Sequence, residues 1–443
     1  MTELPVAFTD QIRSMLGDEY PAFLRAMDMP PALALRLNPD RPSAERAAAP
    51  FICEAVPWEP LGRYLLPGAK PGADIAHWAG AYYIQEASAM VPAGVLKPRP
   101  GERVLDLCAA PGGKSTQMAL SMAHEGVLVA NDPELPRAKV LASNLERMGA
   151  SNALVVSALP DKLAERWPET FDAILVDAPC SGEGMFRRDP DARIEWNPST
   201  PAGCAARQAG ILDCAARMLK PGGRLVYSTC TLNRVENEDG IGAFLDRHPD
   251  FSPEDFHLNG LEPSRDGMLK LFPHRIHGDG HFAALLRKAG EASLEAAPLN
   301  RLDPAASKLL AALERETGPL PEWLRGMRLL LNGDRLYAAP QGTPRLDGLR
   351  VIAPGLSLLR AGRSHIEPQH ALAMALPMGG ALREIALDNA RARDYLAGEA
   401  LPAEGEKGWG RVTWKDLPLG WGKLSDGTLK NHLPKGLRRS VAG

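Results

Sequence analysis

The stretch VLDLCAAPGGK at residues 104–114 decides how this chain folds. Its first four residues have the apolar pattern of a short buried strand, and Ala109–Gly113 is a loop of small residues. Residues 115–123 then have the pattern of a helix. Such a unit presents backbone N–H groups at the carboxyl edge of a sheet, where open α/β folds bind ligands. We therefore expect a ligand at this turn.

Two alternatives to a ligand site of this type are a P-loop and an ordinary βα turn. Gly113-Lys114-Ser115 looks like the end of a P-loop, but a Walker A motif needs a glycine five residues before Gly113. That position holds Cys108, which excludes phosphate binding by such a loop. The motifs farther along the chain argue against an empty turn.

Length and composition indicate a globular chain of two to four domains. No apolar run reaches the ~18 residues of a membrane span, and the first residues, MTELPVAFTDQ, lack the features of a signal peptide. We expect a cytoplasmic protein without a membrane partner. The six cysteines form no CxxC pair, so we expect thiols and no metal site. The net charge of −3 does not by itself suggest nucleic-acid binding, yet residues 407–443 hold eight Lys/Arg against two Asp/Glu.

Residues 96–288 alternate short strand patterns with helical ones, which predicts a doubly wound, mainly parallel sheet. The expected strands are 103–107, 127–131, 153–157, 173–177 and 224–228, with a closing strand at 281–287. The clearest helix covers 203–219 and is stopped by Pro221-Gly222-Gly223. We expect this catalytic α/β domain to be flanked by further modules.

The flanking regions divide into three parts. Residues 1–95 combine a helix around Phe8 and Ile12 with strand-like sequence at 33–39, and form an N-terminal accessory domain. Residues 289–370 are a linker (289–300) and an intermediate region, with a helix at 304–316 and a hairpin at 329–340 turning at Asn332-Gly333. Residues 371–443 carry a helix within 380–400 and then a small β-fold.

Three acidic or thiol side chains follow predicted parallel strands. Asp132 comes after the second strand, where a carboxylate accepts hydrogen bonds from a ribose; a helix cap is the alternative. Asp177 and Cys180 follow the fourth strand in DAPCSGEG, and Cys230 follows the fifth in YSTCT. Two thiols at one sheet edge without metal spacing suggest nucleophilic chemistry, with a thiolate favoured by Lys114 and by a helix starting at 234. The alternative is that both cysteines are buried structural thiols.

The segments CAAPGGK, DAPCSGEG and YSTCT, in this order, resemble those of the RNA cytosine-5 methyltransferases of the NOL1/NOP2/Sun group, and most closely the bacterial RsmF/YebU branch, which acts on small-subunit (16S) ribosomal RNA. The resemblance covers nearly the whole chain, and GKLSDGTLKNHLPKGLR at 422–438 resembles the PUA-like module of that branch. It implies a Rossmann-like class I methyltransferase core with an N-terminal accessory domain and a C-terminal PUA-like RNA-binding module.

The resemblance also implies a set of site residues. Those that would bind S-adenosylmethionine are Cys108, Ala109, Ala110, Pro111, Gly112, Gly113, Lys114, Asp132, Arg137 and Asp177. Family precedent makes Cys230 the nucleophile and Cys180 the thiol that assists product release, although the Pro-Cys nucleophile of DNA cytosine methyltransferases would point to Cys180. Asp177 is the candidate proton donor to ring nitrogen 3, provided that burial raises its pKa; Lys114 would hold Asp177 or stabilise a thiolate.

One departure concerns the adenine of the cofactor. Many relatives carry an aspartate after the third strand that contacts adenine, whereas this chain has Ala158 and Leu159 there and Asp161 slightly late. We expect backbone and apolar contacts from Ala158 and Leu159 in its place.

The expected macromolecular partner is RNA rather than DNA, bound by a monomer. Arg187 and Arg188, just after the Cys180 loop, are candidates for phosphate contacts, with a solvated basic turn as the alternative. In the tail, the candidates are Lys423, Lys430, Lys435 and Arg438, with Lys415 and Arg439 beside them. Trp409, Trp414 and Trp421 would stack on bases or, for at least two of them, form the core of the module. Methylation of transfer RNA, and a non-catalytic ribosome-assembly factor that binds RNA, are the alternative functions.

Overall fold

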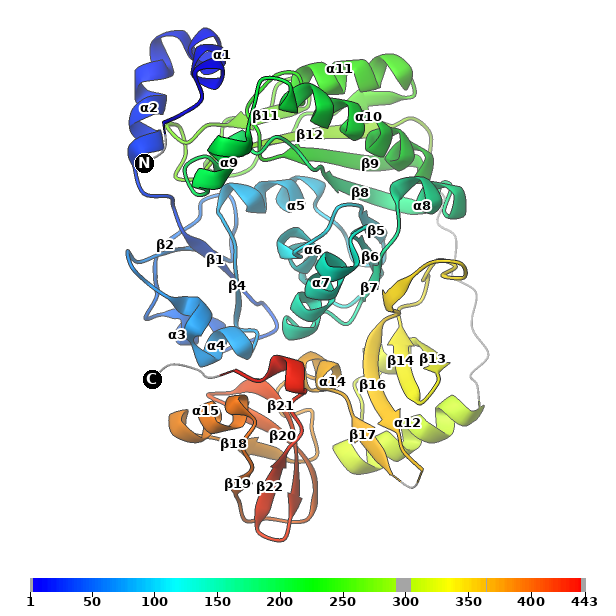
Figure 1. Ribbon diagram of the computed structural model, residues 1–443. Helices are drawn as coiled ribbons and strands as arrows, with labels where there is room; N and C mark the ends of the chain where they lie inside the picture. The colour runs from blue at the N-terminus through cyan, green and yellow to red at the C-terminus, as the bar shows by residue number, and fades with distance from the viewer. Residues whose placement is uncertain (1–2, 292–303, 364, 440–443) are drawn as a thin grey trace.

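The computed structural model describes residues 3–291, 304–363 and 365–439. Within them the chain builds four sheets, which the ribbon of Figure 1 shows. Most of the linker predicted at 289–300 lies outside the described residues. None of the described helices combines the length and apolar character needed to cross a bilayer.

The largest sheet has nine strands in the order β10-β12-β9-β8-β5-β6-β7-β15, with β11 beside β12. Their bounds are β5 (Arg103–Asp106), β6 (Val127–Asn131), β7 (Ala153–Val156), β8 (Phe171–Asp177), β9 (Leu219–Thr229), β10 (Phe251–Pro253), β11 (Met268–Leu271), β12 (His281–Lys288) and β15 (Val351–Ala353). Strands β5 to β9 pair in parallel, and β12 closes the sheet antiparallel to β9. The predicted strands are confirmed.

Helices cover both faces of this sheet, as Figure 1 shows. One face carries α5 (Val91–Leu96), α6 (Gly113–Ser121) and α7 (Leu135–Arg147), and the other carries α8 (Pro160–Arg166), α10 (Thr200–Met218) and α11 (Glu238–Arg247). Two separate apolar clusters form the two layers, one around Met118 and Leu141 and one around Leu212 and Phe244. The doubly wound fold is therefore confirmed. The helix after Cys230 begins at Glu238 and not at 234, because residues 234–237 form turns.

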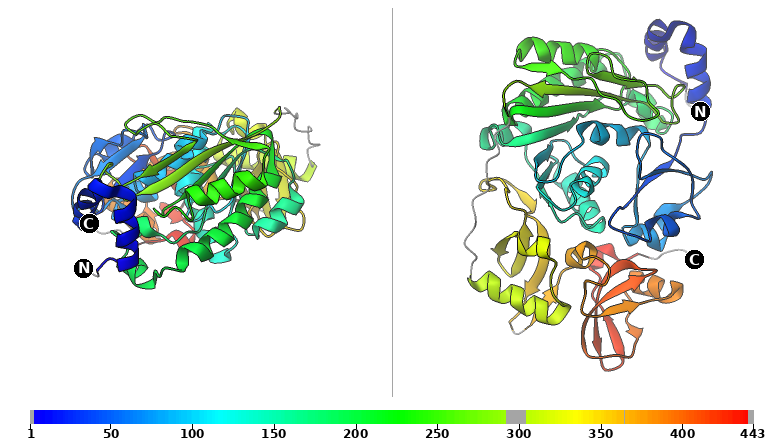
Figure 2. Two further views of the ribbon diagram at one scale, coloured as in Figure 1. Left: turned by 90° about the horizontal axis from the view of Figure 1, so that it is seen from above. Right: turned by 180° about the vertical axis from the view of Figure 1, so that it is seen from behind.

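The N-terminal region forms a second sheet, in the order β2-β3-β1-β4. Its elements are α1 (Val6–Leu16), α2 (Tyr20–Asp28), β1 (Ala34–Leu37), α3 (Ala44–Ala48), β2 (Ile52–Ala55), β3 (Gly62–Leu65), α4 (Ile75–Trp78) and β4 (Tyr82–Ile84). The apolar face of α1 packs on the catalytic domain rather than on this sheet. There the rings of Phe8 and Phe186 lie edge to face, with their centroids 4.9 Å apart. Both views in Figure 2 show these N-terminal helices beside the catalytic sheet.

The C-terminal half forms two small β modules. The first has the order β13-β14-β16-β17 and comprises α12 (Pro304–Thr317), α13 (Glu322–Arg325), β13 (Arg328–Asn332), β14 (Arg335–Ala339), β16 (Leu356–Ala361), β17 (Ile366–Pro368) and α14 (His370–Ala375). Its hairpin turns at Gly333-Asp334, one residue later than predicted, because Asn332 still pairs with Arg335. The left-handed φ of +60° falls on Gly333, which tolerates it.

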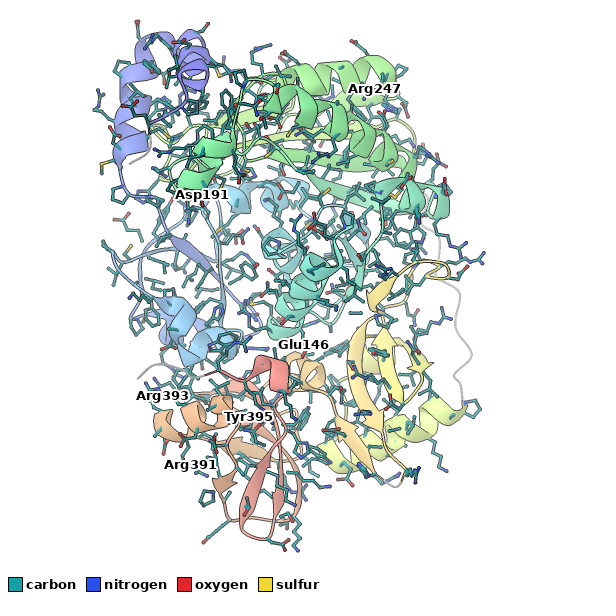
Figure 3. The ribbon with its side chains drawn as sticks, in the orientation of Figure 1. Glu146, Asp191, Arg247, Arg391, Arg393 and Tyr395 are labelled. Carbon is teal, nitrogen blue, oxygen red and sulfur yellow. The ribbon has the colours of Figure 1, made fainter. Side chains whose placement is uncertain are left out.

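The second module has the order β18-β20-β21-β22-β19. It comprises β18 (Glu384–Ala386), α15 (Asn389–Ala397), β19 (Leu401–Pro402), β20 (Gly408–Trp414), β21 (Leu417–Ser425) and β22 (Thr428–Asn431). Tyr395 on α15 donates to the Trp421 carbonyl at 2.9 Å, and Glu146, at the end of α7 nearest the C-terminal modules, bonds His370 of α14 at 2.7 Å (Figure 3). These bonds tie α15 to its own sheet and α14 to the catalytic domain.

Candidate active site

The glycine-rich loop between β5 and α6 is held tightly against its neighbours. Ala109 donates its N–H to the Asn131 carbonyl at 2.8 Å, and the Arg137 guanidinium donates to the Ala110 carbonyl at 3.1 Å. Gly112 has a φ of +113°, and a Cβ there would lie 3.0 Å from Leu141. The loop therefore needs glycine for both its conformation and its approach to α7.

A cavity of about 220 Å³ opens beside this loop. It is lined by Tyr83, Ile84, Gln85, Ala89, Asp106, Cys108, Ala109, Ala110, Pro111, Gly113, Lys114 and Asp177. Seven of the predicted cofactor residues thus share one cavity, whereas Gly112, Asp132 and Arg137 stand outside its lining. The residues from 83 to 89 were missed by sequence reasoning, because no local pattern places the N-terminal segment against this loop.

The hydrogen bonds of Asp106 show whether the cavity fits S-adenosylmethionine, the cofactor that the resemblance implies. One carboxylate oxygen accepts from Ser115 at 2.6 Å, while the other is buried and bonds no group among the described residues. Burial raises the pKa of Asp106 to about 7. An unpartnered buried carboxylate in a cavity suits a cationic ligand, and the methionine part of the cofactor carries an ammonium group. The residues present therefore fit the cofactor.

Asp132 lies at the end of β6 with only 1% of its surface exposed. It accepts the N–H of Glu134 at 3.0 Å and pairs with Arg137 at 3.4 Å. Burial raises its pKa. Arg137 thus bonds both Asp132 and Ala110, so its contacts in this structure hold the loop together.

Cys180 and Cys230 meet at the carboxyl ends of β8 and β9, with their sulfur atoms 3.3 Å apart. The strands bring them together because Asp177 pairs with Ser228 in parallel register. The hydrogen bond to Cys230, followed by burial, holds the pKa of Cys180 well above the value of a free thiol. Cys180 therefore keeps its proton in this state.

Lys114 and Asp177 form an ion pair of 2.7 Å beside these thiols. Ser228 donates to the other Asp177 oxygen at 2.8 Å. Burial alone would raise the pKa of Asp177, but Lys114 and then His281 outweigh it and hold this pKa well below its usual range. The expectation that burial makes Asp177 a proton donor is therefore wrong for this state, because the carboxylate is ionised and accepts hydrogen bonds.

His281 is a site residue that the sequence reasoning missed. It begins β12 next to β9, is 3% exposed, and its Nε2 lies 3.8 Å from Asp177 without a hydrogen-bond partner among the described residues. Burial lowers its pKa, so the imidazole is neutral near pH 7. The only signal in the sequence is its position at the start of the closing strand.

Arg187 and Arg188 both bond a buried carboxylate, Asp279. Arg187 bonds Asp279 at 2.8 Å and the Gly278 carbonyl at 2.8 Å, and Arg188 bonds the other Asp279 oxygen at 2.6 Å. Asp279 is 2% exposed and the Arg187 side chain 6% exposed. Both guanidinium groups neutralise one buried carboxylate, which favours a structural role for the buried Arg187; for Arg188, whose side chain is 26% exposed, the phosphate contact stays a prediction.

In the tail, the three tryptophans Trp409, Trp414 and Trp421 are all buried, which confirms that at least two form the core of the module. The lysines lie outside it. Lys423 and Lys430 stand directly opposite each other on β21 and β22, and like charges in such a pair repel. Of the remaining candidates, Lys435 is exposed and Arg438 donates to the Leu433 carbonyl at 3.2 Å.

Four family models match separate segments of the chain. The family described as 16S rRNA methyltransferase RsmB/F matches residues 93–287. The N-terminal domain of RsmF matches 4–87, its first C-terminal domain 314–376 and its PUA domain 382–439. The ribosomal RNA small subunit methyltransferases F of Cronobacter sakazakii and Erwinia tasmaniensis are 34% and 31% identical to the chain. Each alignment covers 98% of this chain, with 96% and 97% of the relatives.

Solved structures of methyltransferases are also similar to this chain. A methyltransferase homologue from Pyrococcus horikoshii is 32% identical over 64% of this chain and 94% of its own, with a TM-score of 0.54. NSun6 from the same organism, solved with the S-adenosylmethionine analogue SFG, shares the fold at 20% identity, with a TM-score of 0.56 over 65% of this chain and 99% of its own. The chain therefore belongs to the RsmB/F family of S-adenosylmethionine-dependent 16S rRNA methyltransferases, with the domain set of its RsmF branch.

Proposed function

We propose that this chain methylates carbon 5 of cytosine in 16S ribosomal RNA through a covalent bond between Cys230 and the base. The observation that carries the proposal is the thiol pair, 3.3 Å apart, at the sheet edge that also holds the Lys114–Asp177 ion pair and the cofactor loop. A methyltransferase acting on an oxygen or an amine has no need of two adjacent thiols.

Carbon 5 of cytosine is a poor nucleophile, and a thiolate corrects this by adding to carbon 6. The sulfur–carbon bond forms, the double bond between carbons 5 and 6 opens, and its electrons make carbon 5 nucleophilic. This is covalent catalysis, in which one difficult step becomes two easier ones. The bound S-adenosylmethionine supplies an electrophilic methyl group for carbon 5.

Cys230 is the better candidate for the attacking thiolate. Burial alone would lower the pKa of Lys114, but Asp177 and then Cys230 raise it, so Lys114 is an ammonium group that interacts with Cys230. A nearby cation favours a thiolate. Cys180, in contrast, holds its proton. This asymmetry supports the family assignment over the Pro-Cys alternative.

Asp177 and Lys114 share the handling of the base. The ionised Asp177 accepts hydrogen bonds, so it orients the cytosine through its exocyclic amino group. Negative charge develops toward ring nitrogen 3 during addition, and the Lys114 ammonium offsets it. The pair thus replaces the single proton donor expected from the sequence.

Release of the product requires loss of the carbon 5 proton and of the Cys230 bond. The largest cause of the raised Cys180 pKa is its hydrogen bond to Cys230. Because Cys230 gives up its charge when it bonds carbon 6, this cause disappears in the adduct and the Cys180 thiol becomes easier to ionise. We therefore assign Cys180, after its own proton has passed to solvent, to removal of the carbon 5 proton, directly or through water; the double bond then re-forms and expels Cys230 as a thiolate.

The cofactor residues are those of the cavity, with Asp132 placed for the ribose hydroxyls beside the loop and Arg137 holding the loop. We propose that RNA enters by way of the N-terminal domain (1–95) and the PUA-like module (371–443), with Lys423, Lys430 and Lys435 on phosphates, while 96–288 carries the catalysis and 289–370 connects the two. A target base must leave its stack, which costs a few kcal/mol.

The test is transfer of labelled methyl groups to 16S rRNA, free and within small subunits, and to transfer RNA. Wild type should label cytosine in 16S rRNA, Cys230→Ala should be inactive, and Cys180→Ala should accumulate a covalent protein–RNA adduct. An adduct with Cys230→Ala and none with Cys180→Ala would exchange the two roles. Labelling of transfer RNA alone would change the substrate, and no labelling would favour a non-catalytic RNA-binding factor.

A further inference from the structure

Glu236 is a buried carboxylate in the loop that follows Cys230. It is 1% exposed, and it accepts the N–H of Ser181 at 3.1 Å and the Ser181 hydroxyl. Gln208 of α10 donates to one of its oxygens at 2.7 Å, and Asn233 donates to the other at 2.7 Å. Ser181 is the residue after Cys180, so Glu236 reaches from the loop of one cysteine to the loop of the other.

All of these donors are neutral. Within the described ranges, no lysine, arginine or histidine forms an ion pair with Glu236. Each Glu236 oxygen accepts two hydrogen bonds, which is the pattern of a carboxylate, a group that only accepts, and the Ser181 contacts bring this group beside Cys180. The Lys114 ammonium interacts with Cys230, whereas Glu236 interacts with Cys180.

A second carboxylate already fixes the shape of the two loops. Glu183 is fully buried and accepts the N–H groups of Leu232 at 3.0 Å and Asn233 at 2.8 Å. In addition, Gly184 donates its N–H to the Cys230 carbonyl at 2.8 Å. The loops therefore stay joined without Glu236, which leaves the charge of Glu236 to be explained.

We propose that Glu236 is a positioning residue that keeps the proton on Cys180 and thereby decides which of the two thiols attacks the base. The inference rests on the proposed function, because only a covalent mechanism gives the two thiols different tasks. A proton retained on Cys180 prevents it from competing with Cys230 for carbon 6. It also leaves Cys180 as a hydrogen-bond donor to the Cys230 sulfur.

The other groups that act on Cys180 are known from the structure. Its hydrogen bond to Cys230 comes first, then burial, and then the charges of Cys230 and Glu236, all of which raise its pKa, while the Gly182 N–H lowers it. Tyr227, which donates to the Glu236 carbonyl at 2.8 Å, has a pKa well above its usual value because of burial and is neutral. Glu236 is thus the fixed anion that acts on Cys180.

The experiment measures alkylation of each cysteine by iodoacetamide in the full-length protein, by peptide mass spectrometry from pH 6 to 10. In wild type, Cys230 should react faster than Cys180 at pH 7. In Glu236→Gln, the rate at Cys180 should rise about tenfold, since each pKa unit changes the thiolate fraction tenfold, and its pH profile should move to lower pH. Glu236→Asp, which keeps the charge, should restore the slow rate.

Ser181→Ala is the matched control, because it loosens the same loop by removing the hydroxyl that bonds Thr231, Glu236 and Asn233 and leaves the Glu236 carboxyl group in place. It should keep Cys180 slow. Equal rates at Cys180 in wild type and Glu236→Gln would overturn the inference, as would fast alkylation in Ser181→Ala, which would make the effect one of loop order. If Glu236→Gln fails to fold, the two alkylation rates in the wild-type protein are the remaining test. A Cys180 that reacts as fast as Cys230 in wild type would overturn the inference.

The same measurement separates this inference from the proposed function. A Glu236-dependent rate at Cys180 in a protein that methylates no RNA would sustain the inference and reject the activity. Normal methylation with adduct formation, together with no effect of Glu236→Gln on Cys180, would sustain the activity and reject the inference.

Discussion

Arg187→Met tests whether Arg187 supports the fold or binds a phosphate. Its guanidinium donates to Asp279 at 2.8 Å, to the Gly278 carbonyl at 2.8 Å and to the Ala26 carbonyl at 3.3 Å. Removing one partner of a buried ion pair costs about 3–5 kcal/mol. Because Arg188 still bonds Asp279 at 2.6 Å, we expect the lower end, about 3 kcal/mol. A domain of 150–250 residues shifts by about 2–4 °C per kcal/mol, which lowers its thermal transition by about 6–12 °C.

The assay pairs thermal melting with RNA binding measured at several salt concentrations. A side chain that neutralises one phosphate of single-stranded RNA contributes about 0.7 to the slope of log affinity against log salt. Arg187→Met should keep the wild-type slope. Lys430→Met, on an exposed lysine of β22, is the matched control and should keep the melting temperature but lose about 0.7 of the slope. An unchanged melting temperature with a reduced slope in Arg187→Met would refute our reasoning and return Arg187 to the RNA surface.

Three further outcomes follow from buried groups. Asp106 binds a proton more tightly in the folded than in the unfolded protein, so the stability it contributes falls as pH rises from about 4 to 7. Asp106→Asn should therefore gain on the order of 4 kcal/mol over wild type at pH 8.5 in urea unfolding of the cofactor-free protein, with little gain near pH 4; a gain independent of pH would contradict this. Gly184→Ala places a Cβ 2.8 Å from the carbonyls of Cys230 and Gly280 and should abolish the RNA adduct on gels, whereas Gly203→Ala in α10, whose Cβ meets nothing within 4 Å, should retain it. Trp421→Ala should cost the PUA-like module about 3–5 kcal/mol of stability and thereby RNA affinity; methyl transfer to a short RNA at saturating concentration should persist, and its loss would show that the module supports the catalytic domain.

Short-range patterns predicted the catalytic sheet well. Apolar tetrapeptides such as 104–107 give buried strands, and parallel strands bring their carboxyl ends to one edge. For this reason Cys180 and Cys230, fifty residues apart in sequence, were expected on one edge and are in contact. The ion pair of Lys114 with Asp177 follows from the same geometry.

Contacts from distant parts of the chain were beyond the sequence. Asp279, the carboxylate that binds Arg187 and Arg188, lies more than ninety residues after them and in an irregular loop. Nothing local marks such a partner, so two arginines beside an active site were interpreted as phosphate ligands. The pKa of Asp177 was misjudged for a related reason, because burial was visible in the sequence pattern and the strength of the Lys114 and His281 contacts was not.

Many relatives carry an aspartate after the third strand that contacts adenine, and this chain has none at that position. The sheet edge beyond β7 shows which groups lie there instead. Strand β15, from the intermediate region, pairs antiparallel with β7, and the Arg350 carbonyl accepts the Ser157 N–H at 2.9 Å. The Ala158 N–H is bonded to the Asn131 side chain at 3.0 Å. The backbone donors of Ser157 and Ala158 are therefore occupied, and the Asp161 carboxylate accepts the N–H of the next residue at 2.8 Å. What remains for adenine here is the half-exposed Leu159 side chain, so we expect apolar contact to replace the hydrogen bond at this position. An open sheet edge can pair with other chains, so a strand that covers it also stabilises the fold. The intermediate region, through β15, therefore both shapes the place expected for adenine and closes this edge of the sheet.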